Sequence, residues 1–134
     1  MAKLIGTYTH ERNENLEPYY SAIGVPYVAR KMMSFTSPRL TISNEGDEWT
    51  ITTSTTLRTV SSKFKLNEEY DEDMPKGALK STTTVEDEST LKTVSVGPND
   101  TKITRTYTCT DEGCVLTLRH EGSGTEAKRY FKRV

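Results

Sequence analysis

The sequence predicts an all-β protein whose antiparallel strands close into an up-and-down barrel. From Arg39 onward apolar and polar residues alternate in short runs separated by turn-forming residues, which is typical of strands joined as hairpins. Hydrophobic residues make up only 33% of the chain, as expected when one face of each strand meets water or a hydrated interior. Since consecutive strands are joined by short turns, a barrel without open edges is favoured over an open sheet.

Length and charge narrow the class of protein further. The 134 residues suit a single domain over residues 1–134, and the net charge of -1 argues against nucleic acid as the main partner. No stretch is long and apolar enough to span a bilayer, and the opening residues lack the apolar run of a signal peptide. The expected location is therefore the cytoplasm. Two cysteines, Cys109 and Cys114, are too few for a disulfide framework, and we expect reduced thiols that hairpin pairing could bring close together.

The chain is expected to begin with one strand and two short helices. The strand covers residues 4–10, and the polar residues 13–15 offer side chains that could cap the first helix. Pro18 suits the first turn of that helix, where its missing N–H costs little. The second helix is expected from about Pro26 through Met33, because Val28 and Met32 fall on one side of it.

The rest of the chain is expected to form strands at close spacing. Residues 70–77 are the exception, because they read as a long polar connection. The expected strands lie around residues 40–42, 49–57, 64–66, 78–85, 90–96, 102–109, 114–120 and 127–134.

Arg105 is a candidate for binding an anion inside the barrel. It lies between Ile103 and Tyr107 on one face of its strand, and an arginine that points into an apolar enclosure is costly unless a counter-ion or water accompanies it. On the last strand, Lys128 and Tyr130 share one face, while Arg129 and Phe131 share the other. Two cations and a phenol converging in one enclosure would suit a single carboxylate.

The sequence offers no case for an enzyme. The two histidines lie far apart, and no serine or cysteine near them has the surroundings of a nucleophile. No phosphate loop, nucleophile elbow or dinucleotide fingerprint is present. We expect no catalytic residues, no cofactor and no metal site.

The order of the elements resembles the intracellular lipid-binding proteins, the family of fatty-acid-binding and cellular retinoid-binding proteins. The resemblance covers nearly the whole chain and depends on the order and spacing of several short motifs. These are residues 6–8, 15–19, 23–25, 69–72 and 116–120. It implies a ten-stranded β-clam of the lipocalin/calycin superfamily, with a two-helix lid after the first strand and a water-filled cavity. It further implies a monomeric, lipid-binding transport protein for long-chain fatty acids. Near the expected opening, the basic residues Arg30, Lys31 and Arg58 are read first as solvated surface, and transient contact with anionic membranes is the alternative.

The resemblance also implies a carboxylate site of one arginine and an Arg-x-Tyr motif. Arg105 is similar to the first arginine and Tyr130 to the tyrosine, while Lys128 stands where the second arginine usually is. Counting back from the chain end favours Lys128 and Tyr130 as the inward pair, and the register with Arg129 and Phe131 inward stays open. The residues expected to line the cavity are Leu16, Tyr19, Tyr20, Val28, Met32, Phe35, Trp49, Ile51, Thr53, Leu57, Leu116 and Leu118.

Two alternatives remain at this point. The ligand could be retinoic acid or another bulky hydrophobic acid, because the sequence does not reveal the shape of the cavity. The chain could also be a β-barrel interaction module with a solid core and no ligand. The position of Arg105 separates these readings, since a solid core should turn this side chain toward solvent.

Overall fold

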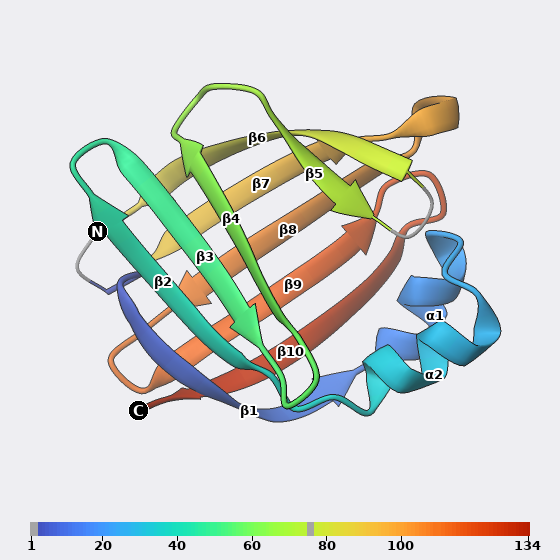
Figure 1. The fold of residues 1–134 in the computed structure, drawn as a ribbon, viewed down its shortest axis with the longest axis horizontal. Coiled ribbons are helices and arrows are strands. Elements are labelled where there is room, and N and C mark those ends of the chain that lie inside the picture. Colours follow the sequence, from blue (N-terminus) through green and yellow to red (C-terminus); the bar gives the residue numbers. More distant parts are fainter. Residues whose placement is uncertain (1–2, 75–76) are drawn as a thin grey trace.

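A computed structural model describes residues 3–74 and 77–134 and has ten strands and two α-helices in those ranges (Figure 1). The strands are β1 (Gly6–Glu14), β2 (Arg39–Glu45), β3 (Glu48–Ser54), β4 (Thr59–Lys65), β5 (Tyr70–Met74), β6 (Gly77–Asp87), β7 (Thr90–Val96), β8 (Lys102–Cys109), β9 (Gly113–His120) and β10 (Thr125–Arg133). The helices are α1 (Leu16–Ala22) and α2 (Tyr27–Ser34), and a 3-10 turn, η1, covers Pro98–Asp100. The expected all-β class with a helical insertion after the first strand is confirmed.

The strands form one antiparallel sheet in the order β4-β3-β2-β1-β10-β9-β8-β7-β6-β5. Pairing of β1 with β10 joins the two ends of the chain, and the sheet curls into a nearly closed barrel (Figure 1). No backbone ladder joins β4 to β5 among the described residues. Side chains bridge this gap instead: Ser62 Oγ donates to Glu72 Oε2 at 3.2 Å, and the rings of Phe64 and Tyr70 stack with centroids 5.1 Å apart.

The stretch expected to be a polar connection is partly a strand, and this expectation was wrong. Tyr70–Met74 form β5, which pairs with β6, while Pro75 and Lys76 lie outside the described residues. Tyr70 and Glu72 point inward, and Asp71 meets Lys80 at 2.6 Å on the outer face. The inward carboxylate breaks the apolar alternation by which a strand is recognised in a sequence.

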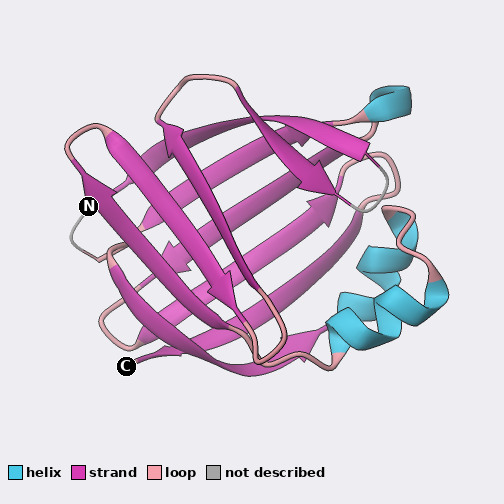
Figure 2. Cartoon of the chain, viewed as in Figure 1, coloured by secondary structure: helices cyan, strands magenta, loops and turns pink. Residues whose placement is uncertain are grey.

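Both helices lie at one end of the barrel (Figure 2). Asn15 precedes α1 in the left-handed backbone region, with φ 56°, and its side chain caps no helical N–H. Its Nδ2 donates instead to the carbonyl of Glu126 at 2.8 Å, which ties the start of α1 to β10. The expected capping role was therefore wrong. Neither helix is long and apolar enough to cross a membrane in the part of the chain that the structure describes.

The end of the barrel away from the helices is filled with apolar side chains. Trp49, Tyr8 and Leu4 are almost completely buried there. Cys109 and Cys114 face each other across β8 and β9, with their Sγ atoms 2.7 Å apart, and both are buried free thiols. The expectation that hairpin pairing brings these cysteines together is confirmed.

Candidate functional site

Arg105 points into the barrel. On β8 it shares the inner face with Ile103, Tyr107 and Cys109, all of which are buried. Its guanidinium contacts both carboxylate oxygens of Glu72, with Nη1 donating to Oε2 at 3.2 Å and Nη2 to Oε1. The side chain is nevertheless 21% exposed. Because it faces the interior, this exposed surface indicates space inside the barrel that protein atoms do not fill.

Glu72 neutralises Arg105 within a wall of hydroxyl groups. Ser81 Oγ donates to Glu72 Oε1 at 2.6 Å, and Arg105 Nη2 also donates to Ser95 Oγ at 2.9 Å. Burial alone would raise the pKa of the Glu72 carboxyl, but the charge and hydrogen bonds of Arg105 hold that pKa below its ordinary value. The pair is therefore ionised and links strands β5, β6, β7 and β8 from within.

The structure corrects the register of β10. Arg129 and Phe131 are buried on the inner face together with Ala127, and Arg129 is only 7% exposed. Their partners on β9 are Leu118 for Ala127, Leu116 for Arg129 and Cys114 for Phe131. Lys128 and Tyr130, the pair expected inside, face outward.

Contacts on the outer surface account for the outward pair. The Arg12 guanidinium lies over the ring of Tyr130, 3.8 Å from its centroid, and Lys128 pairs with Glu14 across the β1–β10 ladder. In the observed register, Ala127 and Phe131 bury their apolar side chains against apolar partners on β9. The opposite register would place Lys128 and Lys132 there, which have less apolar surface to bury. The Arg129 alternative is therefore the one the fold adopts.

Arg129 lies just beneath the lid and is bound by neutral groups. Its Nε donates to Asn13 Oδ1 at 2.9 Å, and its Nη2 donates to the carbonyl of Thr36 at 3.0 Å. The hydroxyl of Tyr20 on α1 is also within hydrogen-bonding reach. Among residues 3–74 and 77–134 no carboxylate pairs with it, and burial lowers its pKa. Arg129 is thus a buried cation without a counter-ion in the described part of the chain.

The buried face of the lid differs in part from expectation. Leu16, Tyr19 and Tyr20 of α1 are buried, as their spacing suggested, and they pack with Ile103, Leu118 and Ala127. On α2, however, no residue is fully buried: Ala29 and Met33 pack toward the core, while Val28, Met32 and Phe35 are exposed. The predicted buried face of α2, with Val28 and Met32, is therefore offset by one residue from the face that packs, with Ala29 and Met33.

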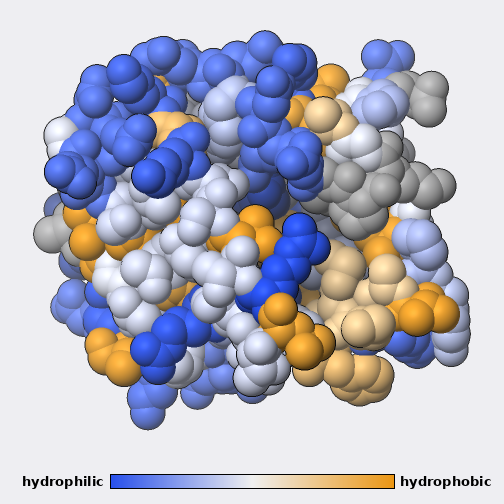
Figure 3. Space-filling view, in the orientation of Figure 1, coloured by the Kyte–Doolittle hydropathy of each residue, from blue (hydrophilic) through white to orange (hydrophobic). Residues whose placement is uncertain are grey.

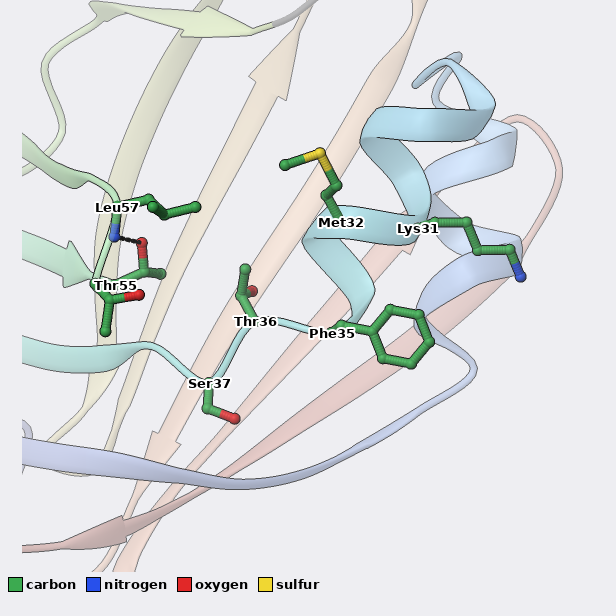
Figure 4. A pocket seen from close by; sticks show the side chains of 8 residues that line it. Lys31, Met32, Phe35, Thr36, Ser37, Thr55 and Leu57 are labelled. Atoms are coloured by element: carbon green, nitrogen blue, oxygen red, sulfur yellow. Dashed lines mark hydrogen bonds between the residues drawn. The ribbon is translucent and has the colours of Figure 1, made fainter.

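The exposed apolar residues surround an opening between α2 and the turn joining β3 to β4. A pocket of about 520 Å³ is lined there by Lys31, Met32, Phe35, Thr36, Ser37, Thr55, Thr56 and Leu57. Met32 and Leu57 point toward each other across it (Figure 4). Hydrophobic residues also gather over the helical end of the molecule in the space-filling view (Figure 3). Leu57, expected on the cavity wall, thus lies at this opening and is 84% exposed.

The other expected lining residues sit on inner strand faces. Trp49 and Ile51 are buried within the apolar cluster, and Thr53, two residues further along β3, is only half-buried. Leu116 and Leu118 lie on the inner face of β9, opposite Tyr107 and Arg105. On β3, exposure therefore increases from the buried Trp49 and Ile51 to the half-buried Thr53, whereas Leu118 on β9 is buried beneath α1.

Sequence reasoning missed three polar residues of the interior: Glu72, Asn13 and His10. No local pattern marks Glu72, since its partner Arg105 is 33 residues away. His10 follows Tyr8 on the inner face of β1, so alternation could have placed it inside. Asn13 could not be placed in this way, because a register shift between His10 and Arg12 breaks the alternation.

No profile of a known protein family matches the chain, but individual proteins do. A fatty acid-binding protein of Tyrophagus putrescentiae is 35% identical over 133 residues, covering 99% of each chain. A human retinoid-binding protein 7 is 40% identical over 72 residues, 54% of each chain. Among solved structures, a Schistosoma mansoni fatty acid binding protein in complex with arachidonic acid superposes with a TM-score of 0.92 at 25% identity, covering 100% of this chain and 98% of that one.

The first of these relatives matches nearly end to end, and the solved structure repeats the ten-stranded arrangement with its two helices. The chain belongs to the intracellular lipid-binding protein family and has its β-clam fold.

Proposed function

We propose that this protein is a cytoplasmic, monomeric carrier of long-chain fatty acids whose carboxylate binds to Arg129. The observation that carries the proposal is that Arg129 is buried without a carboxylate partner in the described residues, whereas Arg105 is neutralised by Glu72. A buried cation lacks a counter-charge that an anionic ligand can supply. Two of the three relatives named above are fatty acid-binding proteins, which fits this ligand class.

Arg105 is proposed to contribute second. Its Nε is buried and has no hydrogen-bond partner among the described residues, so it can donate to a carboxylate oxygen or to a water beside it. Since its other nitrogens are held by Glu72 and Ser95, it should influence affinity less than Arg129 does. The acyl chain would lie along the apolar inner residues. Burying a sixteen-carbon tail is worth on the order of 10 kcal/mol before association costs, so the tail supplies most of the affinity.

The exposed apolar residues at the opening are proposed as the route by which the ligand enters. Met32 and Leu57 border the pocket beside the cation Lys31, and transient contact of this surface with an anionic membrane would place the opening at the source of lipid. The two free thiols fit a reducing compartment such as the cytoplasm. The proposal includes no chemical step.

Titration with a fluorescent long-chain fatty acid tests the proposal. Wild-type protein should bind in a saturable way, and Arg129→Gln should weaken acid binding by about one to two decades, because a charge-assisted contact contributes roughly 1.5–3 kcal/mol. Binding of the corresponding alcohol should change little. Lys128→Gln is the matched control, since it removes one positive charge from the adjacent, outward position and should leave affinity unchanged. Equal losses for acid and alcohol in Arg129→Gln would count against a carboxylate site.

A retinoid is the second candidate ligand, because a human retinoid-binding protein is similar to half of this chain. Retinoic acid carries the same carboxylate and could use Arg129 in the same way. A competition series of fatty acids against retinoic acid decides between them. Displacement of the fluorescent fatty acid by retinoic acid at lower concentration than by oleate would make the retinoid the preferred ligand.

A further inference from the structure

A bulge in β1 turns two polar side chains toward Arg129. The pairing of β1 with β10 runs Tyr8 to Arg133 through His10 to Phe131, then shifts so that Asn13 faces Arg129. The shift leaves Glu11 without a partner in this ladder and brings both His10 and Asn13 to the inner side. Arg12, which precedes Asn13, points to the outer face, where it lies over Tyr130 and contacts Glu14.

The hydrogen bonds around Asn13 determine how His10 is protonated. Asn13 Nδ2 donates to the carbonyl of Ser34 at 3.3 Å, which fixes the orientation of the amide, and Oδ1 accepts from Arg129 Nε. His10 Nε2 lies 2.6 Å from the same Oδ1. Because that oxygen can only accept, Nε2 must carry a proton. A hydrogen bond with the backbone of Arg12 also favours the charged ring, so the doubly protonated form has partners ready.

Burial and one neighbouring charge oppose that doubly protonated form. Burial of the ring lowers the pKa of His10, the hydrogen bond to Asn13 raises it, and the charge of Arg129 lowers it again. From β10 the other group against His10 is the ring of Phe131, with centroids 5.6 Å apart. The neighbouring segment before β2 offers the carbonyl of Pro38, and the lid residues near Arg129 offer the Ser34 and Thr36 carbonyls and the Tyr20 hydroxyl. Burial is therefore the main factor that lowers the pKa of His10, and Arg129 is the neighbouring charge that adds to it.

We propose that His10 is a proton-coupled residue of the headgroup site: when an anionic headgroup binds to Arg129, His10 takes up a proton. The inference deepens the proposed function and depends on it. A carboxylate on Arg129 cancels the charge that opposes protonation, and the hydrogen bonds that favour the imidazolium remain. By linkage, a ligand whose binding is accompanied by proton uptake binds more tightly as pH falls through the range in which the histidine titrates. The sign distinguishes it from protonation of the ligand, which would weaken binding to Arg129 as pH falls.

Histidine NMR on the native chain provides a direct test, because the sequence holds only His10 and His120. The ring signals of both are followed across pH without ligand, with oleate and with oleyl alcohol. Oleate should move the titration of His10 to higher pH, and oleyl alcohol should not. His120 is half-buried at the end of β9, where its Nδ1 contacts Ser123 Oγ at 2.7 Å in the turn to β10, and serves as the internal control. Its titration should not change with either ligand.

Affinity measurements complete the test. Oleate should bind about threefold to tenfold more tightly at pH 6 than at pH 8. His10→Gln keeps a donor that can reach Asn13 but cannot titrate, so it should bind oleate with a flat pH profile, while His120→Gln should keep the wild-type slope. If oleate binds and the titration of His10 does not move, the inference is overturned and the proposed function stands. If the folded protein binds no long-chain acid at any pH, the proposed function fails and the inference falls with it.

Discussion

The two ends of the barrel are built from similar kinds of residue used in opposite ways. At the end away from the helices, the large apolar side chains are enclosed, and Trp49 is 1% exposed. At the helical end, α1 packs into a buried cluster of its own, but comparable side chains on and beside α2 face outward, and Phe35 is 83% exposed. Apolar groups stabilise the fold only where folding removes them from water. The closed end and the α1 cluster therefore supply stability, and the surface around α2 is left available to a lipid.

Replacing Trp49 should show the largest effect at the closed end. Trp49→Ala removes a buried aromatic side chain from the cluster that contains Phe64 and Ile51, and should lower the free energy of unfolding by about 3–5 kcal/mol. Urea denaturation followed by circular dichroism measures this loss. Phe35→Ala is the matched control at the open end and should stay within about 0.5 kcal/mol of wild type. Similar losses in the two variants would mean that the ends do not differ in this way.

The Arg105–Glu72 pair lies in the interior between the two ends. Breaking this pair should cause the next largest loss in the free energy of unfolding. Glu72→Gln leaves Arg105 without its counter-charge and weakens the bridge from Ser62 to β5. Removing one partner of a buried pair costs about 3 kcal/mol or more, and the loss should be visible in the same denaturation experiment. Asp71→Asn is the control, because the neighbouring Asp71–Lys80 pair is exposed to solvent and its loss should hardly change the free energy of unfolding.

The doubly substituted chain separates charge from packing. In Glu72→Gln with Arg105→Gln neither of these two positions keeps a charge without its partner, so part of the lost stability should return. If the double variant is less stable than Glu72→Gln alone, the two residues stabilise the barrel through contacts other than their mutual charge. Such a result would also lower the expected difference between Arg105 and Arg129 as ligand-binding groups.

Strands with clear alternation and short turns were predictable from the sequence. The expected ranges 90–96 and 102–109 coincide with β7 and β8. The apolar residues Ile103 and Tyr107 on either side of Arg105 also correctly predicted that its side chain points inward. The register of β10 was not predicted, because each face of this strand carries two cations and one aromatic ring. A usable signal was present: Glu126, Lys128 and Lys132 share one face, whereas Ala127 and Phe131 share the other.

Other features depend on partners that are distant in the sequence. Glu72 stands in an acidic run, and its role becomes visible only through its contact with Arg105 on β8, three strands further along the chain. Asn13 faces Arg129 because of a bulge, which shifts alternation by one residue without a local warning. On α2, apolar residues occur around most of the helix, so the packed face is decided by contact with α1 and not by spacing alone.

Exchanging the apolar residues at the opening should have the smallest effect on stability and a selective effect on lipid transfer. Phe35→Ser together with Leu57→Ser changes two side chains that are exposed in the folded chain, so the free energy of unfolding should stay within about 0.5 kcal/mol of wild type. Equilibrium affinity for a fatty acid should also hold, because the proposed headgroup site at Arg129 is untouched. Transfer of a fluorescent fatty acid from anionic vesicles should slow by about threefold or more, since each substitution removes apolar surface that can enter the membrane interface.

Val60→Ser is the matched control, because Val60 is another exposed apolar residue outside the set that lines the pocket. An unchanged transfer rate in the double variant would mean that the exposed apolar residues at the open end do not assist transfer from the membrane.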